Sequence, residues 1–250
     1  MTDTVIVTDE GAVRLIRMNR PDKKNALTGE MYDAMAEALE TANASSPIRC
    51  VVIAGVPGAF SAGNDLGDFM KAAMGGGGLG TAVLRFLYAM ARTERPLVAA
   101  VQGVAVGIGT TMMLHCDYAV AATDARFQTP FVALGLIPEA ASSLIAPRLM
   151  GQRRAFELLV MGKALNGAEA KEWGLVNQVV PADQVEAEAM KAAQVIAALP
   201  PEGVAISRRL MKGAPDETVK RIDEEGEQFR KRLQSDEARA AFTAFFNRKK

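Results

Sequence analysis

Residues 97–122, LVAAVQGVAVGIGTTMMLHCDYAVAA, contain the pattern that decides the fold. Leu97–Val101 and Tyr118–Ala122 are short, wholly apolar runs of the kind found in strands that are covered on both faces. Between them lie a glycine-rich turn and an apolar segment beginning near Gly107, which we interpret as a buried helix. A strand, a turn, a helix and a second strand in this order predict an α/β unit with buried strands.

The segment from Pro96 to Cys116 contains no charged residue and is long enough to cross a bilayer, so a transmembrane helix is the alternative interpretation. Gly103 and Gly107 also have the GxxxG spacing of paired membrane helices. Pro96, Gln102 and the glycines interrupt the segment, however, and no second span or aromatic belt accompanies it. We therefore favour a buried strand and helix in a protein without a membrane partner.

The same strand signature recurs along the chain. Two alternating runs at the N-terminus predict a β-hairpin, and Thr28 can cap a helix whose Met31, Met35, Leu39 and Ala42 share one face. The hairpin strands are residues 4–8 and 12–18, further strands are Cys50–Ala54 and residues 176–180, and helical patterns occupy residues 153–161 and 168–173. This alternation predicts the α/β fold class with mostly buried strands.

Strand signals end near Asp183, and helical patterns follow over residues 183–199, Pro201–Lys212, residues 216–234 and Asp236–Asn247. We predict a core over residues 1–195 that contains the active site and a helical C-terminal region over residues 196–250. The last helix places Phe242, Phe245 and Phe246 close together, which is more apolar surface than a lone terminal helix can hide. Packing against another subunit accounts for these rings, and packing on the chain's own core is the alternative.

Charge and composition restrict the partners. The 250 residues include 29 Lys plus Arg and 29 Asp plus Glu, so the net charge gives no reason to expect nucleic acid or an anionic membrane. Cys50 and Cys116 lack metal-ligand or redox spacing, which suits free thiols in a reducing compartment. The N-terminus has neither a secretory nor a transit pattern, so a cytoplasmic location is predicted. His115 is the only histidine, which we interpret as structural, and no metal is predicted.

Glu139 is the only ionisable side chain between Arg126 and Arg148. Its neighbours, such as Ile137 and Pro138, are apolar, so the carboxylate is expected to be partly desolvated. Desolvation disfavours the charged form and raises the pKa toward the range in which a base works near neutral pH. We interpret Glu139 as a candidate catalytic base. A loop glutamate that turns out to water after Pro138 is the alternative.

Two predicted strands end in glycine-marked turns. Residues 59–66 follow the strand Cys50–Ala54, and residues 103–109 follow Leu97–Val101. Each turn places free backbone N–H groups at a strand-to-helix junction, where the helix N-terminus is electropositive. Two such donors that converge on one carbonyl oxygen form an oxyanion hole. A third glycine run, residues 75–78, predicts a mobile loop, and since it lacks the residues of a phosphate-binding motif, no nucleotide cofactor is predicted.

A set of short motifs extends over nearly the whole chain. They are Arg20-Pro21 with Asn25-Ala26-Leu27, residues 59–66, Val101-Gln102-Gly103, residues 105–109, Cys116-Asp117-Tyr118, Phe127, Leu134-Gly135, and Ala170 with Gly174-Leu175-Val176. As a set they resemble the crotonase, or enoyl-CoA hydratase/isomerase, superfamily. The resemblance implies a crotonase-like spiral of ββα units followed by helices that form trimers, often paired into hexamers. It also implies acyl-CoA thioester substrates, with coenzyme A as part of the substrate and no separate cofactor.

The resemblance also implies the residues of the site. Two backbone amides hold the thioester enolate in this superfamily, and they fall here on Asn64 and Ile108. The implied substrate and CoA-binding residues are Lys24 near the CoA phosphates, Ala62, Asp65 and Leu66 beside the adenine and pantetheine, Pro130 and Phe131, and Phe245 and Arg248, which would close the site.

The chain departs from the hydratases at two positions. Hydratases of the superfamily hold and activate water with two glutamates, and Thr111 and Phe131 occupy the matching positions. The motifs Thr129-Pro130-Phe131, Leu134-Gly135, and Pro138-Glu139 followed by Ser142-Ser143 are instead similar to Δ3,Δ2-enoyl-CoA isomerases of fatty-acid β-oxidation, in which one glutamate at the position of Glu139 shuttles a proton. An isomerase is therefore predicted. The alternatives are another crotonase reaction, such as atypical hydration, thioester hydrolysis or a ring-modifying step, and an inactive acyl-CoA-binding subunit.

Overall fold

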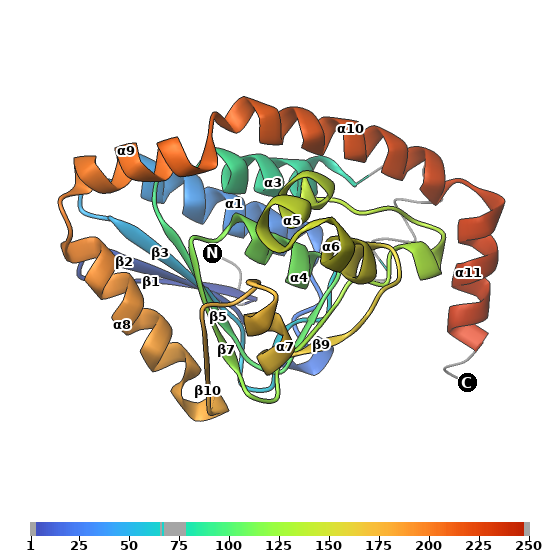
Figure 1. Cartoon of the computed structure of the whole chain (residues 1–250), viewed down its shortest axis with the longest axis horizontal. Coiled ribbons are helices and arrows are strands. Elements are labelled where there is room, and N and C mark those ends of the chain that lie inside the picture. Colours follow the sequence, from blue (N-terminus) through green and yellow to red (C-terminus); the bar gives the residue numbers. More distant parts are fainter. Residues whose placement is uncertain (1–3, 66, 68–78, 248–250) are drawn as a thin grey trace.

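A computed structural model describes residues 4–65, 67 and 79–247 of the chain, and Figure 1 shows its arrangement. The larger sheet has the order β1-β2-β3-β5-β7-β10. Its strands are β1 (Val5–Glu10), β2 (Val13–Met18), β3 (Cys50–Ala54), β5 (Leu97–Val101), β7 (Tyr118–Ala122) and β10 (Gln178–Val180). Only the β1–β2 hairpin pairs antiparallel, and every other pair in this sheet is parallel. The predicted α/β class is therefore confirmed, although the last strand is shorter than expected.

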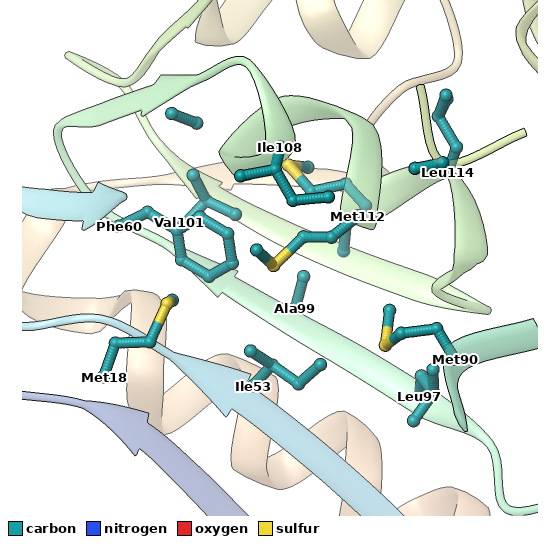
Figure 2. Packing of buried hydrophobic residues seen from close by; sticks show 14 of the residues in the cluster. Met18, Ile53, Phe60, Met90, Leu97, Ala99, Val101, Ile108, Met112 and Leu114 are labelled. Atoms are coloured by element: carbon teal, nitrogen blue, oxygen red, sulfur yellow. The ribbon is translucent and has the colours of Figure 1, made fainter. Parts of the chain in front are cut away.

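The central strands are covered on both faces, as their continuous apolar sequences predict. Every residue of β3 and β5 is buried. Helix α8 (Val185–Ala198) packs against β3, β5 and β7 on one side of the sheet. On the opposite side, the side chains of Ile108 and Met112 lie over Ala99 and Val101 of β5, with Phe60 beside them (Figure 2). The glycine turns that follow these strands are therefore attached to a rigid, closely packed base.

A second, smaller sheet contains the turns of the site. Its strands, in the order β4-β6-β8-β9, are β4 (Ala59–Ser61), β6 (Val104–Val106), β8 (Arg126–Gln128) and β9 (Leu165–Asn166). Each strand has only two or three residues, too few for an alternating or continuous apolar pattern, so sequence periodicity did not reveal this sheet. β4 pairs with β6 in parallel, so the segments that follow the two strands leave the sheet at the same edge.

The helices of the core agree with the predicted ones in part. Helix α1 (Gly29–Ala44) begins at Thr28, whose side chain accepts a hydrogen bond from the Met31 amide, and its predicted apolar face is buried. The other α-helices of the core are α3 (Thr81–Arg92), α4 (Ile108–Thr111), α5 (Ser142–Met150), α6 (Gln152–Leu159) and α7 (Gly167–Glu172). The 3-10 turn η2 (Met112–His115) continues α4, and further 3-10 turns are η1 (Pro21–Lys23), η3 (Val132–Leu134) and η4 (Ala182–Gln184). The sequence patterns did not predict α3 and α5, and α5 contains Pro147 and begins without a side-chain cap of its own.

The predicted C-terminal helices are present. They are α8, α9 (Pro201–Lys212), α10 (Pro215–Leu233) and α11 (Asp236–Asn247), and in Figure 1 α10 runs across the molecule above α3 and α5. Helix α11 packs on η3, and Phe242 is buried within the chain itself. Packing on the chain's own core therefore explains this ring, whereas the side chains of Phe245 and Phe246 lie outside the described residues. Exposed apolar side chains occur instead on α9, where Leu210 is 79% and Met211 86% exposed.

The uncharged segment 96–116 is not a membrane span. It forms β5, β6, α4 and η2, and the part of the chain that the structure describes contains no helix with the length and apolarity needed to cross a bilayer. Cys50 is buried, Cys116 is partly buried, and both thiols are free, as predicted. The glycine run 75–78 lies outside the described residues.

Candidate active site

Glu139 lies in the loop between η3 and α5, and its side chain is buried, with 1% of the residue exposed. Its Oε1 accepts a hydrogen bond of 2.5 Å from the Thr111 hydroxyl. Its Oε2 is also buried and has no hydrogen-bond partner within residues 4–65, 67 and 79–247. The loop therefore does not turn this glutamate out to water. One carboxylate oxygen is fixed, and the other retains its lone pairs for a proton.

The surroundings of Glu139 favour its protonated form. Burial raises the pKa of this carboxyl from 4.5 to about 8, while the hydrogen bond from Thr111 lowers the pKa and the negative charge of Glu225 raises it. A carboxyl that exchanges its proton near neutral pH has the property required of a general base that must also return the proton.

Backbone pairing determines the direction of the Asn64 amide. The Leu27 N–H donates to the Gly63 carbonyl at 2.8 Å, and the Asp65 N–H donates to the Leu27 carbonyl, also at 2.8 Å. Asn64 is thus the middle residue of a parallel bridge with Leu27, and its own N–H points away from Leu27. Gly63 has φ of +93°, a conformation that L side chains rarely adopt. This turn presents one candidate oxyanion donor.

The Ile108 amide is the second candidate donor. Gly107, with φ of 56° and ψ of −121°, precedes α4, and its carbonyl accepts from the N–H groups of Thr110 and Thr111. Ile108 is the first residue of the helix, so its N–H has no acceptor within the helix and points out of the helix N-terminus. Its side chain is anchored in the core beside Met112 (Figure 2), which fixes the backbone position of the donor.

The two turns are in close contact. A Cβ on Gly63 would lie 3.0 Å from the Val106 carbonyl oxygen, and a Cβ on Gly109 would lie 2.7 Å from the Ser61 carbonyl oxygen. Both glycines are therefore required by the approach of the turn after β4 to the turn after β6. The close packing places the Asn64 and Ile108 segments side by side, as the parallel pairing of β4 and β6 also requires.

Two side chains connect the base to these turns. Thr111, which bonds Glu139, lies three residues after Ile108 in the same helical segment. The buried Tyr32 of α1 donates to the Asn64 side-chain oxygen at 2.5 Å. Burial raises the pKa of Tyr32 well above its usual value, and the charge of Glu139 adds to this increase. Glu139, Asn64 and Ile108 are thus brought into one region, although they are far apart in the sequence.

The residues implied for CoA binding form a second group beside the Asn64 turn. The Ala62 N–H donates to the Lys24 carbonyl at 2.8 Å, so Lys24, which has φ of 50°, lies beside this turn. The Asp65 carboxylate accepts from Arg20 at 2.7 Å and from the Gly67 N–H at 2.9 Å. These bonds hold the loop that contains Lys24, Ala62 and Asp65 in one shape. Leu66, the side chain of Phe245 and the whole of Arg248 lie outside the described residues.

Phe131 and Thr111 occupy the positions that glutamates have in the hydratases. Phe131 is buried, and its ring lies 3.9 Å from the place that a Cβ on Gly107 would occupy. Its neighbour Pro130 is partly buried. The Thr111 hydroxyl is used in the bond to Glu139. Neither side chain can ionise. Of the two carboxylates that the described residues place beside these turns, Asp65 is paired with Arg20, whereas one oxygen of Glu139 is unpaired.

Sequence reasoning missed two residues of this region, Tyr32 and Glu225. Glu225, on α10, is 5% exposed and accepts hydrogen bonds from the loop that follows Glu139. Its sequence signal is weak, because a glutamate in a strongly charged helix normally faces water. The position of Glu225 between the apolar residues Ile222 and Phe229 on the helix was the one available sign.

Comparison with known proteins agrees with this geometry. The family model for enoyl-CoA hydratase/isomerase matches residues 8–250. Enoyl-CoA delta isomerase 2 of Rattus norvegicus is 38% identical over 98% of this chain, and the chain spans 64% of the length of that relative. The 1,2-epoxyphenylacetyl-CoA isomerase of Escherichia coli (strain K12) is 32% identical over 88% of this chain and 86% of that relative.

Solved structures show the same fold. The structure of Pseudomonas aeruginosa OdaA is 43% identical, covers 98% of this chain and 99% of its own, and superimposes with a TM-score of 0.92. The predicted crotonase-like spiral and the family resemblance are therefore confirmed. Since the family model covers nearly the whole sequence and the fold agrees with it, the chain belongs to the enoyl-CoA hydratase/isomerase family.

Proposed function

We propose that the protein is an acyl-CoA thioester enzyme of fatty-acid metabolism, a Δ3,Δ2-enoyl-CoA isomerase. The observation that carries this proposal is the state of Glu139. One carboxylate oxygen is held by Thr111, and the other is buried and has no partner among the described residues. The backbone N–H groups of Asn64 and Ile108, which point away from their own segments, lie in the same region. This arrangement provides one base and one anion site, and it provides no second carboxylate at the position of Thr111 or Phe131 to hold water.

The reaction needs a proton to leave one carbon and return to another. The thioester carbonyl oxygen of a 3-enoyl-CoA accepts hydrogen bonds from the backbone N–H groups of Asn64 and Ile108. Glu139 Oε2 then takes a proton from C2, and the C2–H electron pair moves into the conjugated system, which gives a dienolate whose oxygen is stabilised by the two amides. Protonated Glu139 returns the proton to C4. The double bond ends between C2 and C3, and the carboxylate is regenerated without any co-reactant.

Apolar walls suit this chemistry better than hydration. Phe131 and Leu136 are buried, and Leu134 and Ile137 are partly buried against the core. Such walls exclude water, which keeps the pKa of Glu139 raised and suppresses the addition of water to the product. We propose that Lys24, Ala62, Asp65, Leu66, Pro130, Phe131, Phe245 and Arg248 contribute to the CoA and acyl site.

A product analysis tests the proposal. The purified protein is incubated separately with a 3-enoyl-CoA and with a 2-enoyl-CoA, and the products are separated and identified by mass and by conjugated-thioester absorbance. We expect interconversion of the two substrates and little 3-hydroxyacyl-CoA. Strong hydration of the 2-enoyl-CoA, or no turnover of either substrate, would refute the isomerase.

A second candidate is another reaction of the family that also proceeds with one carboxylate and a stabilised thioester oxyanion. The similarity to the Escherichia coli 1,2-epoxyphenylacetyl-CoA isomerase, over 88% of this chain, favours a ring-modifying step as the form of this candidate. An inactive acyl-CoA-binding subunit is the third. Turnover of an aromatic epoxide thioester but not of 3-enoyl-CoA would support the second candidate, and tight acyl-CoA binding without any turnover would support the third.

We also propose a homo-oligomer, a trimer or a dimer of trimers, whose interface uses the helical region of residues 196–250. Helix α9 buries none of its residues within the chain, although Ile206, Leu210 and Met211 are exposed apolar side chains on it. Light scattering should give a mass at least three times the chain's 26.6 kDa. Leu210→Glu with Met211→Glu should reduce this mass, whereas Val195→Glu on α8, also exposed, serves as the control. A monomeric parent protein would refute the proposal.

The cytoplasmic location stays a prediction, and one relative, enoyl-CoA delta isomerase 3 of Mus musculus, is named as peroxisomal.

A further inference from the structure

The loop that carries Glu139 has an unusual backbone. Ala140 and Ala141, the two residues after Glu139, have φ of +63° and +54°. Residues other than glycine rarely adopt this left-handed conformation, and two in succession persist only where the surrounding structure enforces them. Helix α5 begins directly afterwards at Ser142. The position of the proposed base therefore depends on what holds this turn.

The turn is held by Glu225, which lies 82 and 84 residues away in the sequence from the two residues that it bonds. Glu225 Oε2 accepts the Ala141 N–H at 2.7 Å, and Oε1 accepts the Ser143 N–H at 3.0 Å and the Ser143 hydroxyl at 2.5 Å. Ala141 is the N-cap of α5, where a side chain normally accepts one of the free helix amides, and alanine has no acceptor. The Glu225 carboxylate, on α10, therefore caps the start of α5 in place of a local side chain.

Two other side chains hold the neighbouring groups. The buried His115 of η2 lies with Nε2 2.7 Å from the Ala140 carbonyl oxygen, so this nitrogen donates its hydrogen. Burial lowers the pKa of His115 to about 4, which keeps the ring neutral. Thr111 holds the Glu139 carboxylate itself. Side chains from three different elements therefore hold three consecutive residues of the turn, and of these three side chains only Glu225 titrates near neutral pH.

We propose that Glu225 is a positioning residue of the active site, which fixes the Glu139 loop through the Ala141 and Ser143 amides and places a second carboxylate near the base. The proposal rests on the proposed function only in treating Glu139 as the base. A helix that packs against the core could hold an apolar residue at this position at lower desolvation cost, as it does at Ile222 and Phe229. Retention of a buried carboxylate there is explained by its three hydrogen bonds to the loop.

The charged and titratable groups around the pair define the expected pH effect. Glu139 faces Thr111 from α4, Glu225 from α10 and Tyr32 from α1. Glu225 faces the hydroxyl and amide of Ser143 and the charge of Arg221, whose guanidinium donates to the Ser143 hydroxyl at 3.1 Å. Burial raises the pKa of Glu225 to about 7, against the opposing effect of these bonds. Since the Glu225 charge raises the pKa of Glu139, its removal should lower the pKa of Glu139.

Two variants separate position from charge. Glu225→Gln preserves length, removes the charge and replaces one acceptor oxygen with an N–H donor, so at least one bond to the loop is lost. Glu225→Asp preserves the charge but shortens the side chain, so the bonds to Ala141 and Ser143 are broken or weakened. Glu227→Gln, on the same helix with a 60% exposed side chain, is the matched control.

Three measurements are made on each full-length variant. They are kcat for 3-enoyl-CoA, the Kd of a non-reactive saturated acyl-CoA, and the infrared titration of the buried protonated carboxyl groups without substrate, with Glu139→Gln used to identify the Glu139 band. We expect kcat to fall about 10-fold to 100-fold in both Glu225 variants, because small displacements of a reacting group have effects of this size. The Kd should change less than kcat, and Glu139 should titrate at lower pH in Glu225→Gln but not in Glu227→Gln.

The outcomes distinguish this proposal from the proposed function. A folded Glu225→Gln with the parent's kcat and the parent's Glu139 titration would overturn the positioning role. Equal loss of kcat and of acyl-CoA affinity, with an unchanged titration, would also overturn it and assign Glu225 to folding alone. If Glu225→Gln does not fold, Glu225→Asp decides by its kcat and Kd. A parent protein without isomerase turnover would refute the proposed function, and the infrared titration would still test the link between Glu225 and Glu139.

Discussion

Replacement of Glu139 by glutamine should make the protein's stability less dependent on pH. The pKa of Glu139 in the folded protein is about 8, raised from 4.5 by burial, so the folded state keeps a proton that the unfolded chain has lost at intermediate pH. Glu139 therefore has its most favourable effect below about pH 4.5 and becomes progressively destabilising as the pH rises through about 8. A neutral glutamine has the same shape without this penalty, and the Thr111 hydroxyl can bond its amide.

The magnitude follows from linkage. One pH unit is equivalent to about 1.4 kcal/mol for one proton, so the penalty from Glu139 should grow by about 2 kcal/mol between about pH 6 and pH 8. The loss or gain of hydrogen bonds in the variant is largely the same at both pH values, so it cancels in the difference between them. Glu225 is present in both proteins, so its own titration contributes little to the comparison.

The assay is urea denaturation of the parent protein and of Glu139→Gln at both pH values. We expect the free energy of unfolding of the variant, relative to the parent, to increase by about 2 kcal/mol from pH 6 to pH 8. Glu157→Gln, with a half-exposed side chain paired with Lys163, is the control and should show a nearly constant difference. The variant should also lose nearly all isomerase turnover while it retains acyl-CoA binding. A constant difference for Glu139→Gln would refute the buried, high-pKa carboxyl, and near-normal turnover would move the chemistry to another residue.

Three further predictions concern the same site. Thr111→Val removes the hydrogen bond that lowers the pKa of Glu139, so the rising limb of kcat/KM against pH should move to higher pH, and a shift to lower pH would contradict this role. Asn64→Ala and Ile108→Ala should retain most activity, because the proposed donors are backbone N–H groups. Asn64→Pro or Ile108→Pro, if circular dichroism shows a folded protein, should lose about 10²- to 10³-fold in kcat, because proline deletes the backbone donor. A folded proline variant with the parent's kcat would exclude that amide as an oxyanion donor. The double variant Thr111→Glu with Phe131→Glu should hydrate 2-enoyl-CoA faster than the parent protein does, and it should be less stable because two carboxylates are buried. Substantial hydration by the parent protein, measured by product analysis, would contradict the argument from the absence of these two glutamates.

Local sequence patterns were sufficient to predict the main strands and the C-terminal helices. Cys50–Ala54 and Leu97–Val101 are continuous apolar runs because parallel strands covered on both faces must be apolar at every position. The capping residue Thr28 and the apolar period after it predicted α1, because each is a local property of a helix. Glu139 was recognised as a candidate base because a single charge in a long apolar segment can be seen without knowledge of the fold.

The small sheet and helix α5 could not be predicted in this way. Strands of two or three residues are stabilised by pairing with distant segments, and their sequences have too few positions for a period to appear. Helix α5 begins after two alanines in left-handed conformation and lacks a cap of its own. Its start is enforced by Glu225 from a helix far along the chain.

The sequence by itself determined the α/β class, the family motifs and the identity of the lone carboxylate and the two glycine turns. Only the tertiary structure decided that Glu139 is buried, that Thr111 binds one of its oxygens, and that Tyr32 and Glu225 reach the same region. The physical reason is that a pKa and a donor direction depend on desolvation and on contacts between segments far apart in the chain, whereas helix and strand patterns depend on residues that are close in sequence.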